Sequence, residues 1–402
     1  IHTYASILTL FAALVLMLTF ELKNGAGVRS GTAAVFVFGL FIMTHRLWSY
    51  EYADMGTYNI AKYNDINAAD DILENRNSDG AIEAVGDEDF YRIGEIGVTS
   101  PGNSAVQRGV QICQRYYSMM LPGISEFTRE LGFNTQMDFK FMDTDRRSIA
   151  DALLGVRYYN VKDGMEEELP FDFDVKAGEG EGYDGHSSAW KNEHYLPLGY
   201  TYDKAIDTGD FYALDLAGRQ EAMLYGAVMD EDGAEAAGLS EPELRLKRRS
   251  VLESIEAISG GETVITDKGI DVRGRDAVLR LDIEGLDRSE TYVVLKGAGF
   301  TDRKLSDAYT DEEWRELSRY ERAVISAEDI FFTPSSSASM YFGTEEGNYT
   351  NKIEYFTPSH ACYTGHDSFI TNLGFHEEGL SSLYLRLSEP GYYSFDSLDV
   401  VC

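Results

Sequence analysis

The chain has 402 residues, enough for two or three domains, and a hydrophobic fraction of 44%, which excludes a globally disordered protein. Its formal net charge is −33, from 35 basic and 68 acidic residues. A surface this acidic repels nucleic acids and anionic lipid headgroups, so we exclude DNA, RNA and a polybasic membrane contact. Halophilic adaptation and divalent-ion binding are two alternative explanations of the acidic surface.

Two apolar runs open the chain. Tyr4–Phe20 has 17 residues without a charge, and Gly31–Met43 is a shorter run that reaches membrane length with its flanks. A membrane-spanning helix needs about 17–25 residues, so we predict two transmembrane helices within residues 1–48. The alternatives are a pair of core helices and a signal peptide. A core helix would show polar residues at helical spacing, and two runs in close succession do not fit a signal peptide.

The short connection between these runs sets the predicted orientation. It carries Lys23 and Arg29, and short basic loops stay in the cytoplasm. The second helix therefore leaves the membrane outward, and residues after about 48 are predicted to lie outside the cell. Because the chain starts at Ile1 rather than Met, we expect it to be the trailing part of a longer, multi-pass membrane protein.

The stretch Gln111–Val161 predicts the order strand, helix, irregular segment, helix, strand. Its second helix is predicted to begin near Asp143 and Asp145, because acidic residues suit a helix N-terminus. The residues at helical spacing that we expect to be buried are Ile149, Leu153 and Leu154. The following segment Val156–Val161 is rich in β-branched and aromatic residues and predicts a core strand.

The next part of the chain changes from an acidic to a basic character. Residues 165–194 are acidic and glycine-rich with no periodicity, so we predict a long surface loop.

One helix is predicted from about Asp215. Ser240–Glu243 has the form of a capping box and predicts another helix, which would run through the basic residues 244–250. We predict a solvated face for this basic run, with a phosphate-binding patch as the alternative.

After Gly260 the sequence consists of short segments with the composition of strands in a β-sandwich. One helix interrupts them, with a capping box at Thr310–Glu313. The predicted fold is therefore α+β. It has two transmembrane helices in residues 1–48, an extracytoplasmic mixed domain in 49–259 that includes the acidic loop, and an incomplete β-sandwich in 260–402.

Sequence motifs predict neither a cofactor nor a metal site. The usual nucleotide-binding, zinc-protease and serine-hydrolase motifs do not occur in a fitting context. His360, Cys362 and His366 cluster in the sequence, but their spacing matches no standard zinc site. The three cysteines, with no CxxC spacing, also predict no disulfide framework.

Aromatic residues are the remaining candidates for ligand contact. The chain has 26 Tyr, 21 Phe and 3 Trp, and sugars bind by stacking on aromatic rings. Most of these rings must belong to the core. The substrate-binding candidates are two adjacent pairs, in each of which one ring should face inward and the other outward: Tyr116, Tyr117, Tyr158 and Tyr159.

Four segments occur in the order and approximate spacing of a known family. They are FYRI at Phe90–Ile93, SEFTRELGF at Ser125–Phe133, DALLGVRYYNV at Asp151–Val161 and NEHYLPLGYTYD at Asn192–Asp203. In these segments the chain resembles the YfhO family of bacterial membrane proteins. That family is similar to glycosyltransferases that take a sugar from a polyprenyl-phosphate carrier outside the membrane.

This resemblance implies a function and the partners that go with it. The partners would be a polyprenyl-phosphate-linked sugar, a cell-envelope glycopolymer of the teichoic-acid type and the lipid bilayer. The resembled enzymes keep a catalytic acidic residue in an early outer loop, which would precede this chain, so no catalytic residue is assigned here. The alternative is a non-catalytic envelope protein that binds glycan or a partner protein.

Overall fold

A computed structural model describes Gly39 and residues 80–98, 110–116, 121–134, 140–141, 143–182, 185–260, 263–330, 332 and 334–402. The chain divides into two units, Ile1–Arg76 and Asn77–Cys402, and the second contains every described residue except Gly39. Apart from Gly39, the two predicted transmembrane segments lie outside the described residues. Within the described part of the chain, no helix combines the length and the apolar character needed to cross a bilayer.

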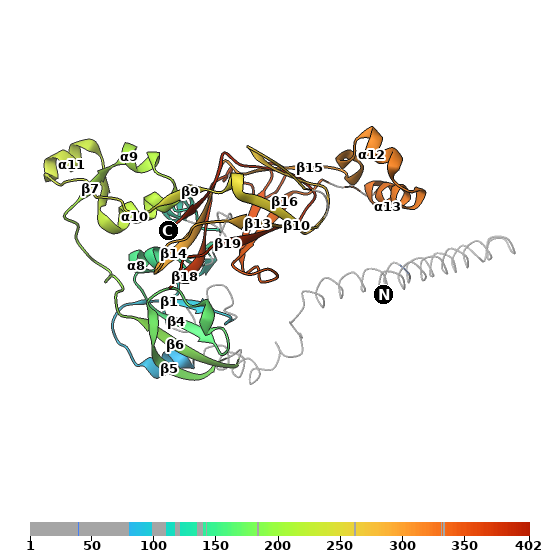
Figure 1. Ribbon diagram of the computed structural model, residues 1–402. Coiled ribbons are helices and arrows are strands. Elements are labelled where there is room, and N and C mark those ends of the chain that lie inside the picture. The colour runs from blue at the N-terminus through green and yellow to red at the C-terminus, as the bar shows by residue number, and fades with distance from the viewer. Residues whose placement is uncertain are drawn as a thin grey trace, which may run out of the picture. The chain divides into compact units, whose positions relative to one another are not determined.

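The first part of the second unit is built on a four-stranded mixed sheet (Figure 1). Its strands follow the order β1 (Arg92–Ile96), β4 (Val156–Lys162), β6 (Gly185–Asn192) and β5 (Phe173–Gly182). β1 and β4 are parallel, whereas the other neighbours are antiparallel. The prediction of a core strand in Gln111–Val161 is confirmed, because β4 is an inner strand with hydrogen-bonded neighbours on both sides.

Short elements surround this sheet. The helix α5 (Ala81–Val85) packs against β5, and two further helices flank the segment that leads into β4. These are α7 (Pro122–Glu130) and α8 (Ser148–Leu154). The strand β2 (Arg115–Tyr116), before α7, pairs with β3 (Lys140–Phe141), which lies between the two helices in the sequence. Both faces of the sheet are covered, so β4 has buried residues on both faces.

The buried side of α8 differs from the predicted one. Ala150 and Asp151 are its buried residues, whereas Ile149, Leu153 and Leu154 are only partly buried. The apolar residues at helical spacing therefore lie on a partly buried side of α8. The side that faces the interior carries a carboxylate, which a prediction from hydrophobic periodicity cannot detect.

The prediction of a long surface loop in 165–194 is wrong. After a short 3-10 turn at Glu166–Glu168, this segment forms the hairpin β5–β6. The sequence of β5 shows no alternation of polar and apolar residues, because glycines occupy the positions that α5 covers. An added Cβ at Gly178 would lie 2.6 Å from the carbonyl oxygen of Ala81, and one at Gly180 would lie 2.7 Å from the carbonyl carbon of Gly80. Only a residue without a side chain allows this approach.

We therefore expect Gly178→Ala to lower the free energy of unfolding by about 1–3 kcal/mol, because α5 must move away from β5. Gly199→Ala is the matched control, since an added Cβ there meets no atom within 4 Å. Urea unfolding of both variants checks the difference. Equal stabilities would show that α5 does not pack on β5 as described.

A small α/β segment follows the sheet. It contains β7 (Ala205–Asp207), α9 (Thr208–Ala213), α10 (Leu216–Tyr225), β8 (Ala227–Met229) and α11 (Glu231–Ala237). The predicted helix from about Asp215 is confirmed as α10. Its N-cap is Asp215, whose carboxylate accepts a hydrogen bond from the backbone N–H of Gly218 at 2.8 Å.

The second predicted helix, from Ser240, is wrong. Residues 241–247 contain no helix or strand, and the carboxylate of Glu221 accepts hydrogen bonds from the backbone N–H groups of Arg245 and Leu246 at 2.6 and 3.3 Å. Glu221 lies on α10 and is buried. This tertiary contact takes up N–H groups that a helix would use and overrides the local capping signal.

The short strands predicted after Gly260 are present. Together with β9 and β10 they form three sheets around one large apolar core, a part of the protein that we call the sandwich. The five-stranded sheet has the order β10 (Ile255–Ser259), β13 (Ala277–Asp282), β19 (Ser382–Leu387), β16 (Ser337–Gly343) and β17 (Asn351–Phe356). A four-stranded sheet has the order β11 (Thr263–Thr266), β12 (Gly269–Val272), β20 (Gly391–Ser394) and β15 (Gly299–Asp302).

The third sheet has the order β18 (Phe369–His376), β14 (Ser289–Lys296), β21 (Ser397–Val401) and β9 (Arg248–Ser250). α10 packs on it, with Leu216 and Ala217 against Tyr292 and Val294. Since β9 and β10 precede Gly260, the sandwich begins earlier in the chain than predicted. Short 3-10 turns lie at Leu252–Ser254 and Leu305–Ala308.

The helical interruption of the sandwich consists of α12 (Asp311–Glu316) and α13 (Arg319–Ile330), which follow β15 in the chain (Figure 1). The predicted capping box is confirmed. The Thr310 side chain accepts from the backbone N–H of Glu313, and the Glu313 carboxylate accepts from the backbone N–H of Thr310.

Candidate functional site

A strained turn leads into α8 and places several charged side chains inside the protein. Asp145 and Arg146 have φ values of 52° and 55°, a left-handed conformation that is costly for residues other than glycine. The turn is held by the carboxylate of Asp143, which accepts a hydrogen bond from the backbone N–H of Asp145 at 2.7 Å. The backbone N–H of Arg147 donates to the carbonyl of Thr144 at 3.2 Å.

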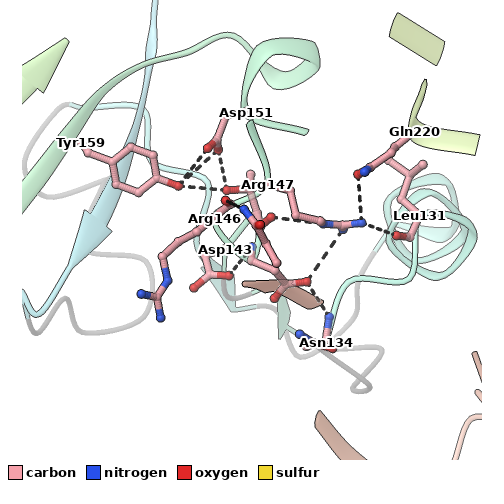
Figure 2. A network of polar contacts seen from close by, with 11 residues as sticks. Leu131, Asn134, Asp143, Arg146, Arg147, Asp151, Tyr159 and Gln220 are labelled. Carbon is pink, nitrogen blue, oxygen red and sulfur yellow. Dashed lines mark hydrogen bonds and ion pairs between the residues drawn. The ribbon is translucent and has the colours of Figure 1, made fainter. Parts of the chain in front are cut away.

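Arg147 is the centre of the resulting polar cluster (Figure 2). Its side chain is 0% exposed. The guanidinium donates to the carbonyl of Leu131 at 2.7 Å and to the side-chain oxygen of Gln220 at 3.4 Å. It lies 4.1 Å from the centroid of the Phe133 ring and forms an ion pair with Asp145 at 3.8 Å. One arginine thus joins the end of α7, the turn before α8 and the helix α10.

Asp151 forms the second part of the cluster, on the side toward β4 (Figure 2). The hydroxyl of Thr144 donates to Asp151 Oδ1 at 2.5 Å, and the hydroxyl of Tyr159 lies 3.2 Å from Asp151 Oδ2. Asp151 is 0% exposed, and burial raises the pKa of its carboxyl group well above the ordinary value. A general acid or base must reach the substrate, and Asp151 in this conformation contacts only protein groups.

The acidic groups of this cluster outnumber its buried cation. Burial, followed by repulsion from Asp143, raises the pKa of Asp145 to about 7, against the opposing effects of Arg147 and the backbone N–H of Asn134. Burial also lowers the pKa of Arg147, although Asp145 and Asp151 counteract this effect. We infer that protons as well as Arg147 neutralise the carboxylates, because an unpaired buried charge is costly.

This pKa predicts a dependence of stability on pH. An aspartate has a pKa of about 3.9 in an unfolded chain, so the folded protein binds the proton of Asp145 more tightly. The contribution of this group is therefore complete below about pH 4 and is lost as the pH rises toward 7, by up to about 1.4 kcal/mol per pH unit.

Asp145→Asn should remove this slope, because asparagine keeps an acceptor for the backbone N–H of Asn134 and tolerates positive φ. Urea unfolding at several pH values between 4 and 7 provides the test. Asp282→Asn, at a carboxylate 66% exposed, is the control and should keep the wild-type slope. Parallel curves for the wild type and Asp145→Asn would contradict the buried titration.

A further set of contacts links this cluster to the sandwich through Glu290 of β14. The hydroxyl of Ser148 donates to Glu290 Oε1 at 2.6 Å, and the amide of Asn372 donates to the same oxygen at 3.1 Å. Tyr292 donates to the other oxygen of Glu290. The Asn372 amide also donates to the carbonyl of Arg146 at 2.6 Å, which ties β18 directly to the strained turn.

An aromatic contact supports the same junction. The rings of Phe171 and Phe375 stack with centroids 4.3 Å apart, and they come from the segment before β5 and from β18. Hydrogen bonds and ring stacking therefore hold the mixed sheet against the sandwich. The cluster around Arg147 and Glu290 fixes the arrangement of the two parts of Asn77–Cys402.

The structure describes two of the four predicted substrate-binding tyrosines fully. Tyr158 and Tyr159 are 3% and 1% exposed, because both faces of β4 are covered. Tyr158 donates to the carboxylate of Asp87 at 2.7 Å, and Tyr159 packs edge-on against Phe173 at 4.7 Å. The two rings do lie on opposite faces of the sheet, as alternation predicts, but neither face is open to solvent. Their contact with substrate stays a prediction that requires the covering residues to move.

The other predicted pair, Tyr116 and Tyr117, lies at the edge of the described residues. For Tyr116 the structure describes only the backbone, in β2, and Tyr117 lies outside the described residues. In the described ranges, no group of three or more His, Cys, Asp or Glu side chains is arranged to hold a metal ion. Of the sequence cluster near 360, His360 accepts a hydrogen bond from the backbone N–H of Cys362 at 3.0 Å and so stabilises a local turn.

Arg147, Asp151 and Glu290 are not among the site residues that the sequence predicts. One signal was available for the first two, since Arg147 and Asp151 are four residues apart at the start of a short helix and so share a face. That spacing is ordinarily a surface ion pair, and only the tertiary structure shows that the face is buried. For Glu290 the local sequence carries no such signal, because its partners come from 142 and 82 residues away.

Comparison with known proteins matches the chain to a family. A family model described as bacterial membrane protein YfhO matches residues 2–310, which include the four segments noted above and both apolar runs. No curated protein matches the chain.

Proposed function

Because the chain belongs to the YfhO family of bacterial membrane proteins, we propose that it is the extracytoplasmic part of a membrane glycosyltransferase, together with adjoining membrane helices. The reaction moves a sugar from a polyprenyl-phosphate carrier to a cell-envelope polymer of the teichoic-acid type. The observation that carries this proposal is the family match over 309 residues, from 2 to 310. In this topology the residues after about 48 lie outside the cell, where both the lipid-linked sugar and the polymer are accessible.

Within this proposal, the described part supports the reaction without supplying the reacting groups. Within the cluster, Arg147 and Asp151 are closed to solvent, and Asp145, which is 12% exposed, is paired with Arg147. Their role is to hold the mixed sheet and the sandwich in one arrangement, which would position the acceptor polymer. Tyr116 and Tyr117 remain proposed sugar contacts, and Tyr158 and Tyr159 would contribute only after a conformational change.

A second candidate function is a non-catalytic envelope protein that binds glycan or another protein. The net charge of −33 favours this candidate, because a chain this acidic repels a polyanionic acceptor polymer. The two candidates differ in whether membranes that contain the protein transfer sugar.

The test uses membranes from cells with and without the gene that encodes this chain. Both preparations receive a labelled polyprenyl-phosphate sugar and poly(glycerol phosphate) as the acceptor. We expect label in the polymer only where the protein is present. Equal labelling in both membranes would reject the transferase, and retained binding of the polymer would then support the second candidate.

A further inference from the structure

The most basic stretch of this acidic chain lies on and beside the edge strand β9. Four of the five residues from 245 to 249 are basic, on a chain with a net charge of −33. We define the basic strip as these four residues, all of which are exposed: Arg245, Lys247, Arg248 and Arg249. The sequence contains no second stretch of five residues outside this region with more than two basic residues.

The position of β9 leaves one edge of the strand open. Among the described strands, β9 is the last of its sheet and pairs with β21 alone. Lys247 and Cys402 exchange two backbone hydrogen bonds of 3.0 Å each. In an antiparallel ladder the next pair, Arg248 and Val401, then directs its N–H and C=O groups away from the partner strand. The open edge therefore presents a backbone donor among the cationic side chains.

The four cations differ in how firmly the protein holds them. Arg248 forms an ion pair with Asp215 at the start of α10, and Arg245 lies 6.0 Å from the centroid of the Tyr225 ring. By alternation, Lys247 and Arg249 lie on the face of the strand opposite to Arg248. Arg249 pairs with Glu284, a carboxylate that is 78% exposed, so this pair contributes little to folding. Lys247 and Arg249 are accordingly the two residues most available to a ligand.

We propose that the basic strip binds a phosphate-bearing polymer. This inference rests on the proposed function, because a teichoic-acid-type acceptor repeats a phosphodiester along its length. From Arg245 to Arg249 an extended backbone covers about 13 Å, which fits a run of phosphates better than a single one.

The basic strip also explains how an acidic chain could bind a polyanionic polymer. A polyanion is repelled by a protein with a net charge of −33, yet at physiological salt the repulsion from acids beyond about 8 Å is largely screened. Contacts within the strip act at shorter range and are attractive. Binding should therefore be local to β9 rather than spread over the surface.

The test compares Lys247→Gln/Arg249→Gln with a matched control, Arg280→Gln/Lys352→Gln. The control removes the same charge from two residues of the five-stranded sheet, each 43% exposed. The full chain in detergent micelles is titrated with poly(glycerol phosphate), with dextran as a neutral polymer and inorganic phosphate as a competitor. We expect the first variant to bind poly(glycerol phosphate) about 30-fold more weakly, and the control within about threefold of wild type.

Wild-type affinity should fall steeply with salt, and inorganic phosphate at equal phosphate concentration should compete poorly. The inference is overturned if the wild type does not bind the polymer, if the two double variants bind equally, or if inorganic phosphate displaces the polymer completely. These outcomes are separate from the transfer assay. Membranes that transfer sugar while the strip variant binds normally would retain the proposed function and reject the strip.

Discussion

Replacement of Arg147 by methionine should destabilise the described unit by about 3–5 kcal/mol, the cost of removing one partner from a buried ionic cluster. The guanidinium is 0% exposed and forms contacts with α7, with α10 and with Asp145. Methionine matches much of the volume but donates no hydrogen bond. The carbonyl of Leu131 and the carboxylate of Asp145 would lose a buried partner.

Arg146 provides the control for this prediction. It is the preceding residue, its side chain is 29% exposed, and it pairs with Glu168. Arg146→Met should cost less than about 1 kcal/mol, as is typical of exposed ion pairs. Urea unfolding of the full chain in detergent micelles compares the two variants; it is followed by tryptophan fluorescence, to which Trp190 in β6 contributes. Similar costs would contradict the central position of Arg147.

Tyr159→Ala should produce the second large effect, a loss of about 3–5 kcal/mol, because it empties a site in the core between β4 and β5. Tyr159 is 1% exposed and packs against Phe173. Tyr159→Phe keeps the ring and removes only the hydroxyl shared with Asp151 and Thr144, so we expect a loss of about 1–3 kcal/mol.

The difference between these two variants separates packing from hydrogen bonding. Trp190 lies opposite Tyr159 across the β4–β6 pair, so its fluorescence reports the unfolding of this region. If Tyr159→Ala were as stable as the wild type, the ring would not be part of the core. The proposal that Tyr159 binds sugar in an open site would then gain support.

The sequence predicts the parts of this fold that depend on local signals. The strand at Val156–Val161 and the capping box before α12 were predicted correctly, since β-branched composition and cap chemistry act within a few residues. The strands of the sandwich were recognised for the same reason.

The parts that could not be predicted depend on contacts between distant residues. The hairpin β5–β6 was not predicted because its glycines, which interrupt the strand pattern, are required by the close packing of α5. The helix expected at Ser240 does not form because Glu221, on α10, binds the backbone of residues 245 and 246. The polar cluster was missed because the local sequence does not distinguish Arg147, Asp151 and Glu290 from surface charges. Only the tertiary structure shows that they are buried.

The rate of sugar transfer by membranes that carry Asp151→Asn, expressed per folded protein, tests most directly whether the buried cluster supports the transferase without reacting. Asparagine keeps the shape of the side chain, and its one oxygen, in the place of Oδ1, can still accept from both Thr144 and Tyr159. We predict measurable transfer with the wild type and, for the folded variant, a rate per molecule within about twofold of it. A loss of about a hundredfold or more with the fold intact would make Asp151 a reacting group and contradict the structural role assigned to the cluster.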